Sequence, residues 1–509
     1  MVGDAISGKQ VFRFETFGNE GFWTDAARLP QGIAAAGLTP KQALLLGLSV
    51  DIDALDATTK AAVAAELASQ GTNGPLLNAA ATTIALLNEN AVIGVVVKDS
   101  NADGQLDVAS GDKVGITCAV CHSITDHAVL DVPSGGGIGK RIDGPTPHNL
   151  NVGTILAAAA NSRAFYPLLQ LKLAANNNKS IGRAPDSDAI DGNSSESDVD
   201  AYLSNPAYYP VGTFDDGPDG NGAPQHIAPF FRTDLAAPFG TPGDVATLDN
   251  FNNLVYSTLL DLTVLVTPDG KNFLKALGGD AAGAELSDTY LQVLTATGVM
   301  GPGATTAGTG FPFVTATLPA GVMAGSEAAP TGRRVHDQKL RDLNAYTDGL
   351  HPPLATGFDA VAAARGAGVF RASGCISCHN VSQAQRVPSF VVPQATLYPG
   401  YVPVVLAQRP VEIPLRPTAF APIQDDPTTI FDDKVVVIEA SRRGEVRGSA
   451  LPLLMDLARK PNFLHDSSVP SLDALFDAAR GATMPHPFYV GAASRPDLIE
   501  FLKSLDDTR

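Results

Sequence analysis

Apolar residues near the end of the chain recur with the spacing of a helix. Four of them stand at positions i, i+3, i+4 and i+7: Leu498, Phe501, Leu502 and Leu505. This spacing puts them on one face of a helix over residues 495–505, and a proline at the second position suits a first turn. Residues 357–370 form a second amphipathic segment, which predicts a helix that ends at Phe370.

The first third of the chain contains several further helical segments with recognisable ends. Thr39 followed by Pro40 is typical of a helix start, and the alanine-rich stretch 56–70 should stop at Gly71. The same patterns predict a helix over 75–88, a short β-rich run over 91–97, and a helix over 338–346 that is followed by the break Pro352-Pro353. Two stretches rich in Gly, Ala, Thr and Pro, 301–310 and 319–332, are predicted to be loops.

One sequence pattern occurs twice. Residues 229–249 and 452–473 share Leu-Ala-x-x-Pro followed by Val-x-x-Leu-Asp, with slips of one residue. Such self-similarity indicates related structural units in tandem.

The composition is that of a globular protein with a strongly acidic surface. Of the 509 residues, 44% are hydrophobic, and the formal net charge is −18. This charge disfavours binding to nucleic acid and favours basic protein partners, although it also serves solubility. No apolar run approaches the length of about 18 residues that a membrane helix needs, so we expect no membrane span.

All four cysteines lie in two strings of the form C-x-x-C-H. These are Cys118-Ala-Val-Cys121-His122 and Cys375-Ile-Ser-Cys378-His379. At this composition, chance would produce such a string at roughly one position in a million. Two thiols at this spacing can add to the two vinyl groups of one haem, and the adjacent histidine can bind its iron.

Other cysteine chemistry explains the two strings less well. A disulfide framework does not require a histidine after each pair, and a zinc site would need the two distant pairs to converge. A thioredoxin-like pair would need a strand-then-helix setting that is missing here. We therefore predict two covalently bound haem c groups, with thioether links at Cys118, Cys121, Cys375 and Cys378, and with His122 and His379 as iron ligands.

These elements predict a mainly α fold of two tandem cytochrome c-like haem domains. Residues 1–350 would form an N-terminal domain enlarged by helical and loop insertions, and residues 351–509 the C-terminal domain. Because haem is attached to this motif outside the cytoplasm, we expect a periplasmic or extracellular bacterial protein. The start of the chain, Met-Val-Gly-Asp, has no export signal, and we expect that such a signal has been removed.

Beyond the haem motifs, Pro461-Asn-Phe-Leu-His465-Asp466-Ser-Ser-Val-Pro-Ser-Leu472 resembles a segment of the bacterial di-haem cytochrome c peroxidase superfamily. That family carries P-Y-F-H-D-G-S-V-x-x-L in its second domain. The resemblance covers residues 357–509 and implies that helices 357–370 and 495–505 cross to form a core. It also implies a peroxidase-like or oxygenase-like activity as one candidate function.

The sequence departs from this family at two positions. The family's F-W-D-G-R-A string has no counterpart after His122, although a similar string, 22–28, lies about 95 residues earlier. A family segment I-G-H supplies a distal histidine, and here Lys140 stands in its place.

The sixth iron ligands distinguish an electron carrier from an enzyme, because an open iron face can bind peroxide or oxygen. For the second haem we favour His486, with Met484 or an open site as alternatives. For the first haem the nearest candidate is His148. The remaining candidates are His226, His336, Met323 and Lys140.

A calcium loop is predicted at residues 99–107. Asp99, Asn101, Asp103 and Gln105 place side-chain oxygens at alternate positions, as in the opening of an EF-hand loop, and Gly104 allows the sharp turn. Ser110 stands where the bidentate glutamate would be, with Asp112 two residues later. A solvated Asp/Asn turn is the alternative.

The sequence favours a di-haem electron carrier between redox protein partners. A di-haem enzyme with one open haem is the alternative hypothesis, and we assign no catalytic residue.

Overall fold

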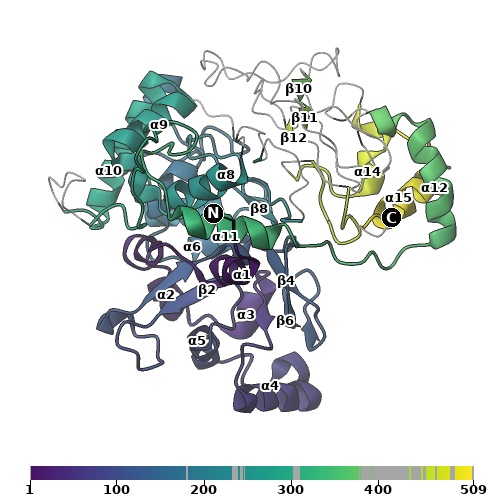
Figure 1. Ribbon diagram of the computed structural model, residues 1–509, viewed down its shortest axis with the longest axis horizontal. Helices are drawn as coiled ribbons and strands as arrows, with labels where there is room; N and C mark the ends of the chain where they lie inside the picture. The colour runs from purple at the N-terminus through teal and green to yellow at the C-terminus, as the bar shows by residue number, and fades with distance from the viewer. Residues whose placement is uncertain are drawn as a thin grey trace. The chain divides into compact units, whose positions relative to one another are not determined.

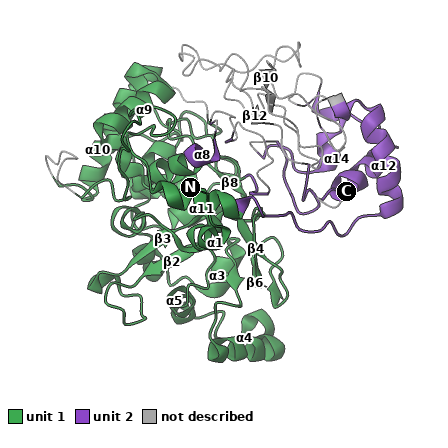
Figure 2. Ribbon diagram, viewed as in Figure 1, with its two compact units in different colours: residues 1–227, 252–346 green, residues 228–251, 347–509 purple. Residues whose placement is uncertain are grey.

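The computed structural model describes most of the chain. The described residues are 2–178, 182–231, 239–240, 245, 247–301, 310–377, 379, 391–392, 435–436, 449–450, 454–464, 467–481, 486 and 488–506. The chain forms two compact units (Figure 2). Unit 1 contains residues 1–227 and 252–346, and unit 2 contains residues 228–251 and 347–509.

The fold is rich in α-helix and contains a few small sheets, in agreement with the predicted α-rich class (Figure 1). The helices of unit 1 are α1 (Ala5–Phe14), α2 (Leu29–Ala36), α3 (Pro40–Leu45), α4 (Ala57–Gln70), α5 (Ala80–Asn88), α6 (Val152–Ala157), α7 (Glu196–Leu203), α9 (Pro268–Gly278) and α10 (Asp280–Ala296). Helices α8 (Leu248–Leu254) and α11 (Asp337–Thr347) each continue across a division between the units. Unit 2 contains α12 (Ala360–Ala372), α14 (Leu472–Leu475) and α15 (Arg495–Lys503).

The strands are short. Those of unit 1 are β1 (Val50–Asp51), β2 (Val95–Lys98), β3 (Lys113–Ile116), β4 (Ser123–Thr125), β5 (Leu130–Asp131), β6 (Gly137–Gly139), β7 (Arg141–Asp143), β8 (Thr213–Phe214) and β9 (Gln225–His226). They form a three-stranded sheet, β1-β6-β5, and the antiparallel pairs β2-β3, β4-β7 and β8-β9. In unit 2, β10 (Val391–Val392), β11 (Val435–Val436) and β12 (Ser449–Ala450) form one small sheet.

The predicted helix ends near the start of the chain are confirmed. Thr39 and Gln42 form a reciprocal capping box at the start of α3, with Pro40 as its first residue. Asp56 caps α4 by accepting the Thr59 N–H, and Gly71 follows the last residue of that helix. Local sequence alone therefore defines these helices.

Two predicted elements differ from the observed ones. Helix α5 begins at Ala80 and not at residue 75, because residues 75–78 form a turn, in which the N–H groups of Leu76 and Leu77 donate to the buried Glu66 carboxylate. The strand predicted over 91–97 is β2, Val95–Lys98. Gly94, with φ of +80°, interrupts the extended backbone just before it.

The predicted helices of the C-terminal region are confirmed, and they pack against each other as α12 and α15 (Figure 1). Their backbones approach closely at Gly366, where an added Cβ would lie 1.9 Å from the carbonyl oxygen of Asp497. The rings of Phe370 and Phe501 are in contact, with centroids 5.4 Å apart. Leu498 and Leu502 are buried in the same apolar cluster.

The repeated sequence pattern also has a repeated structure. Phe239 pairs with Val245 through two backbone hydrogen bonds of 2.7 and 3.2 Å, and Phe463 pairs with Val469 through bonds of 2.7 and 3.3 Å. In each copy a helix begins three residues after the valine. The described parts of the two copies therefore form the same turn followed by a helix.

The predicted absence of a membrane span agrees with the helices that the structure describes: none combines the length and the apolar character that crossing a bilayer requires.

The close approach at Gly366 gives a stability prediction. Gly366→Ala should lower the free energy of unfolding by about 1–3 kcal/mol, because the new methyl group must push α15 away. Gly368 is a matched control on the same helix, since nothing lies within 4 Å of its Cβ position. Gly368→Ala should leave stability unchanged or raise it by up to about 1 kcal/mol in urea unfolding. Equal effects of the two changes would contradict the predicted packing.

Candidate functional site

The first C-x-x-C-H string forms a tight turn between two strands. Cys118 opens a short 3-10 helix, η4 (Cys118–Val120), directly after β3, and the N–H of His122 donates to the Cys118 carbonyl at 3.1 Å. The His122 carbonyl in turn accepts the N–H of Gly144 at 2.7 Å. The turn is therefore fixed by backbone hydrogen bonds on both sides.

Strand β3, which leads into Cys118, is held by side chains from an early part of the chain. Asn19 exchanges two hydrogen bonds with the backbone of Ile116, and Thr24 does the same with Val114. Thr24 belongs to a π-helical turn, η1 (Phe22–Ala26), which lies within the string that resembles F-W-D-G-R-A. The fold thus brings that string against the strand that precedes the first motif, although 95 residues separate them in sequence.

Burial keeps the two thiols of the first motif neutral. It raises the pKa of Cys118 to about 11 and that of Cys121 to about 12. Cys118, Cys121 and Cys375 all carry free sulfurs. Reactive and metal-binding cysteines have lowered pKa values, so this setting disfavours thiolate chemistry. A thioether link carries no charge and is compatible with such burial.

Tyr256 contacts the first motif from a second π-helical turn, η7 (Val255–Leu259). Its hydroxyl oxygen lies 3.1 Å from Sγ of Cys118. Burial raises the pKa of Tyr256 well above its ordinary value, and the hydroxyl therefore keeps its proton. π-helical turns are rare and are often found at functional sites.

Two of the candidate ligands for the first haem lie together. The rings of His148 and His226 stack with centroids 5.4 Å apart and planes at 15°. The hydroxyl of Thr146 bonds to the Ile227 carbonyl at 3.1 Å and so connects the two segments.

The other candidates for this iron lie in different surroundings. Met323 is 75% exposed, and Lys140 is also exposed. The backbone carbonyl of His336 accepts the first hydrogen bond of α11. His127 pairs with Asp131 at 2.8 Å in an exposed turn.

The second C-x-x-C-H string begins with the same backbone feature as the first. Cys375 starts η9 (Cys375–Ser377) after the end of α12, and the N–H of His379 donates to the Cys375 carbonyl at 2.9 Å. Cys378 lies outside the described residues.

The rings of His379 and His486 lie close to each other. Their ring centroids are 6.4 Å apart, with planes at 52°. An imidazole nitrogen binds a metal at about 2.0–2.1 Å and lies about 1.1 Å from its ring centre, so two ligands on opposite sides of one ion have centroids about 6 Å apart. The observed centroid distance is close to this value.

The environment and the backbone conformation of His486 are both unusual. Burial, followed by the proximity of His379, lowers the pKa of His486 to about 3, so the imidazole is neutral and can donate a lone pair. Its φ of +56° is unusual for a residue with a side chain and often marks a functional position. The rings of Phe476 and Phe488 flank it at 6.2 and 5.4 Å. Met484, the alternative ligand, lies outside the described residues.

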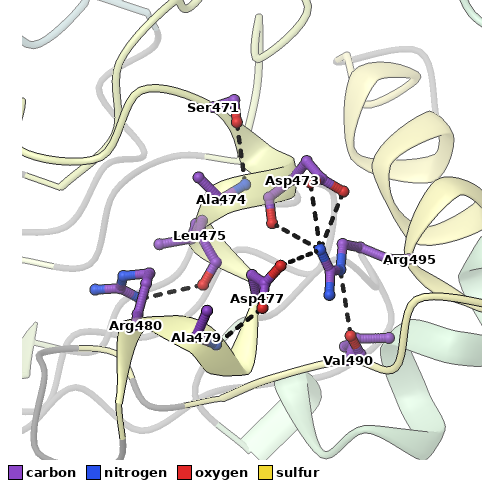
Figure 3. A network of polar contacts seen from close by, with 9 residues as sticks. All are labelled: Ser471, Asp473, Ala474, Leu475, Asp477, Ala479, Arg480, Val490 and Arg495. Atoms are coloured by element: carbon purple, nitrogen blue, oxygen red, sulfur yellow. Dashed lines mark hydrogen bonds and ion pairs between the residues drawn. The ribbon is translucent and has the colours of Figure 1, made fainter.

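A polar network holds the loop that carries His486 (Figure 3). Arg495 contacts the carboxylates of Asp473 and Asp477 and donates to the Val490 carbonyl. Arg480 donates to the His486 carbonyl at 3.3 Å and to that of Leu475 at 3.1 Å. The loop is therefore anchored before and after His486.

The predicted calcium loop forms an acidic cluster in which Asp112 takes part. Carboxylate oxygens of Asp99, Asp103 and Asp112 lie within 4.8 Å of one another, and the Asn101 amide donates to Asp103. Gln105 contributes its backbone N–H, which donates to Asp103. Asp112 therefore adds a third carboxylate to the predicted loop. Carboxylate oxygens are ligands that calcium prefers.

Comparisons of the chain with protein-family models, with curated proteins and with solved structures gave no match.

Sequence reasoning did not identify several residues that surround these sites. Tyr256 lies 138 residues from Cys118 in sequence, and Asn19 lies 97 residues from Ile116. Arg495 was predicted only as part of a helix start. No local pattern distinguishes these residues, because each acts through a long-range contact.

The network around Arg495 predicts how the His486 loop responds to its loss. Arg495→Gln should lower the melting temperature of the protein and speed hydrogen exchange at the Val490 N–H, which bonds to the Phe476 carbonyl at 3.1 Å. Arg365 is a suitable control, because its side chain, which pairs with Asp497, is more exposed than the side chain of Arg495. Arg365→Gln should leave exchange at Val490 unchanged. If the Val490 N–H were as well protected from hydrogen exchange in Arg495→Gln as in the wild type, the anchoring role of Arg495 would be contradicted.

Proposed function

We propose that this protein is a di-haem c-type cytochrome that transfers electrons between redox partners. The observation that carries the proposal is that His379, the histidine of the second C-x-x-C-H string, lies beside a neutral His486, with ring centroids 6.4 Å apart. The same string occurs at Cys118, and the two strings use every cysteine of the chain.

Each residue has a distinct role in this proposal. Cys118 and Cys121 would link one haem by thioether bonds, and Cys375 and Cys378 would link the other. His122 and His379 would bind the irons, and each iron would cycle between Fe(III) and Fe(II). His486 would bind the second iron as its sixth ligand, and the apolar rings beside His486 would exclude water and substrate. A six-coordinate iron of this kind passes electrons and leaves no site for peroxide.

The proposed architecture is two tandem cytochrome c-like domains, 1–350 and 351–509, in a periplasmic or extracellular protein. The packing of α12 against α15 supports the C-terminal domain, whereas both copies of the repeated Phe–Val pairing, 239–245 and 463–469, lie in unit 2. The net charge of −18 supports a basic redox protein as partner, since opposite charge speeds the encounter.

A peroxidase-like or oxygenase-like enzyme is the second candidate. The stacked His148 and His226 favour it, because only one of them is needed as a ligand and the other could move protons beside the first haem.

The proposal predicts the spin state of the second haem. In the oxidised wild-type protein this iron should be low-spin by electron paramagnetic resonance, and His486→Ala should convert one of two haems to a high-spin, cyanide-binding form. The exposed His351 gives a control, and His351→Ala should leave the spectrum unchanged.

Haem content is measured on the same samples by the pyridine haemochrome assay and by protein mass. Two haems per chain are expected in every variant. A colourless protein would refute the proposal, and a high-spin signal already present in the wild type would favour the enzyme.

We also propose calcium as a structural ion at Asp99, Asp103 and Asp112, with Asn101 and Gln105 in the same loop. Calcium at about a hundredfold excess over its Kd should stabilise the fold by about 2.7 kcal/mol, which a chelator would reverse. Asp103→Asn should weaken this effect, whereas Asp53→Asn, at an exposed carboxylate outside the loop, should preserve it. A melting temperature that is the same with calcium and with chelator would refute the proposal.

A further inference from the structure

Tyr256 contacts an atom that would belong to the edge of the first haem. Its hydroxyl oxygen lies 3.1 Å from Sγ of Cys118; the Tyr256 side chain is buried and Cys118 is half-buried. When the sulfur of Cys118 forms a thioether it loses its proton, so the tyrosine hydroxyl must then act as the donor. The contact therefore becomes a directed O–H···S hydrogen bond.

Phe17 continues this contact toward the outside of the unit. Its ring meets the Tyr256 ring edge-on, with centroids 4.5 Å apart. The φ of Phe17 is +52°, which is an outlier for a bulky residue. The backbone of Phe17 is fixed by two hydrogen bonds, one from its N–H to the Glu15 carboxylate at 2.8 Å and one from the N–H of Thr315 to its carbonyl at 2.6 Å.

The outer side of Phe17 lies next to a charged pair at the surface. The ammonium group of Lys339 lies 5.3 Å from the centre of the Phe17 ring and pairs with Glu15. The side chain of Lys339 is 43% exposed. Glu15 and Lys339 also line a surface cavity of about 390 Å³ between α1 and α11.

We propose that Tyr256 and Phe17 form the route by which electrons pass between the first haem and the surface at Lys339. Electron tunnelling is fastest through close contacts, and this row of side chains leaves no wide gap between the sulfur of Cys118 and the surface. This arrangement requires two unfavourable backbone conformations: the strained backbone of Phe17 and the π-helical turn that carries Tyr256. The proposal rests on the proposed function, since it requires a haem at Cys118.

The electron balance of the step is simple. A one-electron donor at the surface is oxidised, the Fe(III) of the first haem is reduced to Fe(II), and no bond is broken. Tyr256 keeps its proton throughout, because burial raises its pKa well above the ordinary value. The two aromatic side chains mediate the transfer without being oxidised themselves.

A photoreductant placed at the surface end tests the route. In the haem-loaded protein all four native cysteines would be bound, so Lys339→Cys can be labelled at one position with a ruthenium polypyridyl complex. Flash photolysis then gives the rate of reduction of the first haem, which is identified as the haem whose spectrum does not change in His486→Ala.

Two variants interrupt the route, and one serves as a control. Phe17→Leu removes the ring and Tyr256→Phe removes the hydroxyl, and each should slow the reduction several-fold after correction for any change in reduction potential. Phe14→Leu changes a ring on the same cavity that lies outside the route, and it should leave the rate unchanged. A label at the exposed Lys9 should report no effect of Phe17→Leu.

The outcomes separate this inference from the proposed function. If both haems are present but the rates from position 339 are the same in wild type, Phe17→Leu and Tyr256→Phe, the route is refuted and the cytochrome proposal stands. If no haem is attached, the proposed function fails first. If Phe17→Leu does not fold, the nearly isosteric Tyr256→Phe decides the question alone.

Discussion

The distance between the rings of His379 and His486 is the constraint on which the interpretation of this protein depends. The ring centroids of the two imidazoles lie 6.4 Å apart, and burial lowers the pKa of His486, so its imidazole is neutral and can offer a lone pair. Contacts in the surrounding fold maintain this spacing. Arg480 and Arg495 hold the loop, and the helix that precedes His379 is packed tightly against α15.

The two C-x-x-C-H strings share a backbone design. In each, the histidine N–H bonds to the carbonyl of the first cysteine, which closes the turn. The first turn receives further support from strand β3, whose backbone is bound by Asn19 and Thr24. Rigid placement of ligands before the cofactor arrives lowers the entropy that binding must overcome.

Much of the local structure followed from the sequence. The caps at Thr39 and Asp56, the apolar face of α15 and the repeated turn at Phe463 all arise from residues close together in the chain. The prediction of one helix start was wrong, because residues 75–78 form a turn and α5 begins only at Ala80. The carboxylate of Glu66, which comes from an earlier helix, accepts two backbone N–H groups of that turn.

The sequence by itself determined the spacing of thiols and imidazoles, and with it the class of chemistry that we propose. The sequence could not identify the distal ligand of each proposed iron. Which residue becomes that ligand depends on the path of a loop in the folded protein and not on the position of the residue in the chain. Only the tertiary structure brought His486 opposite His379, Tyr256 to the sulfur of Cys118, and Asp112 to the acidic loop. These contacts join residues from separate segments of the chain, which no local sequence pattern could pair.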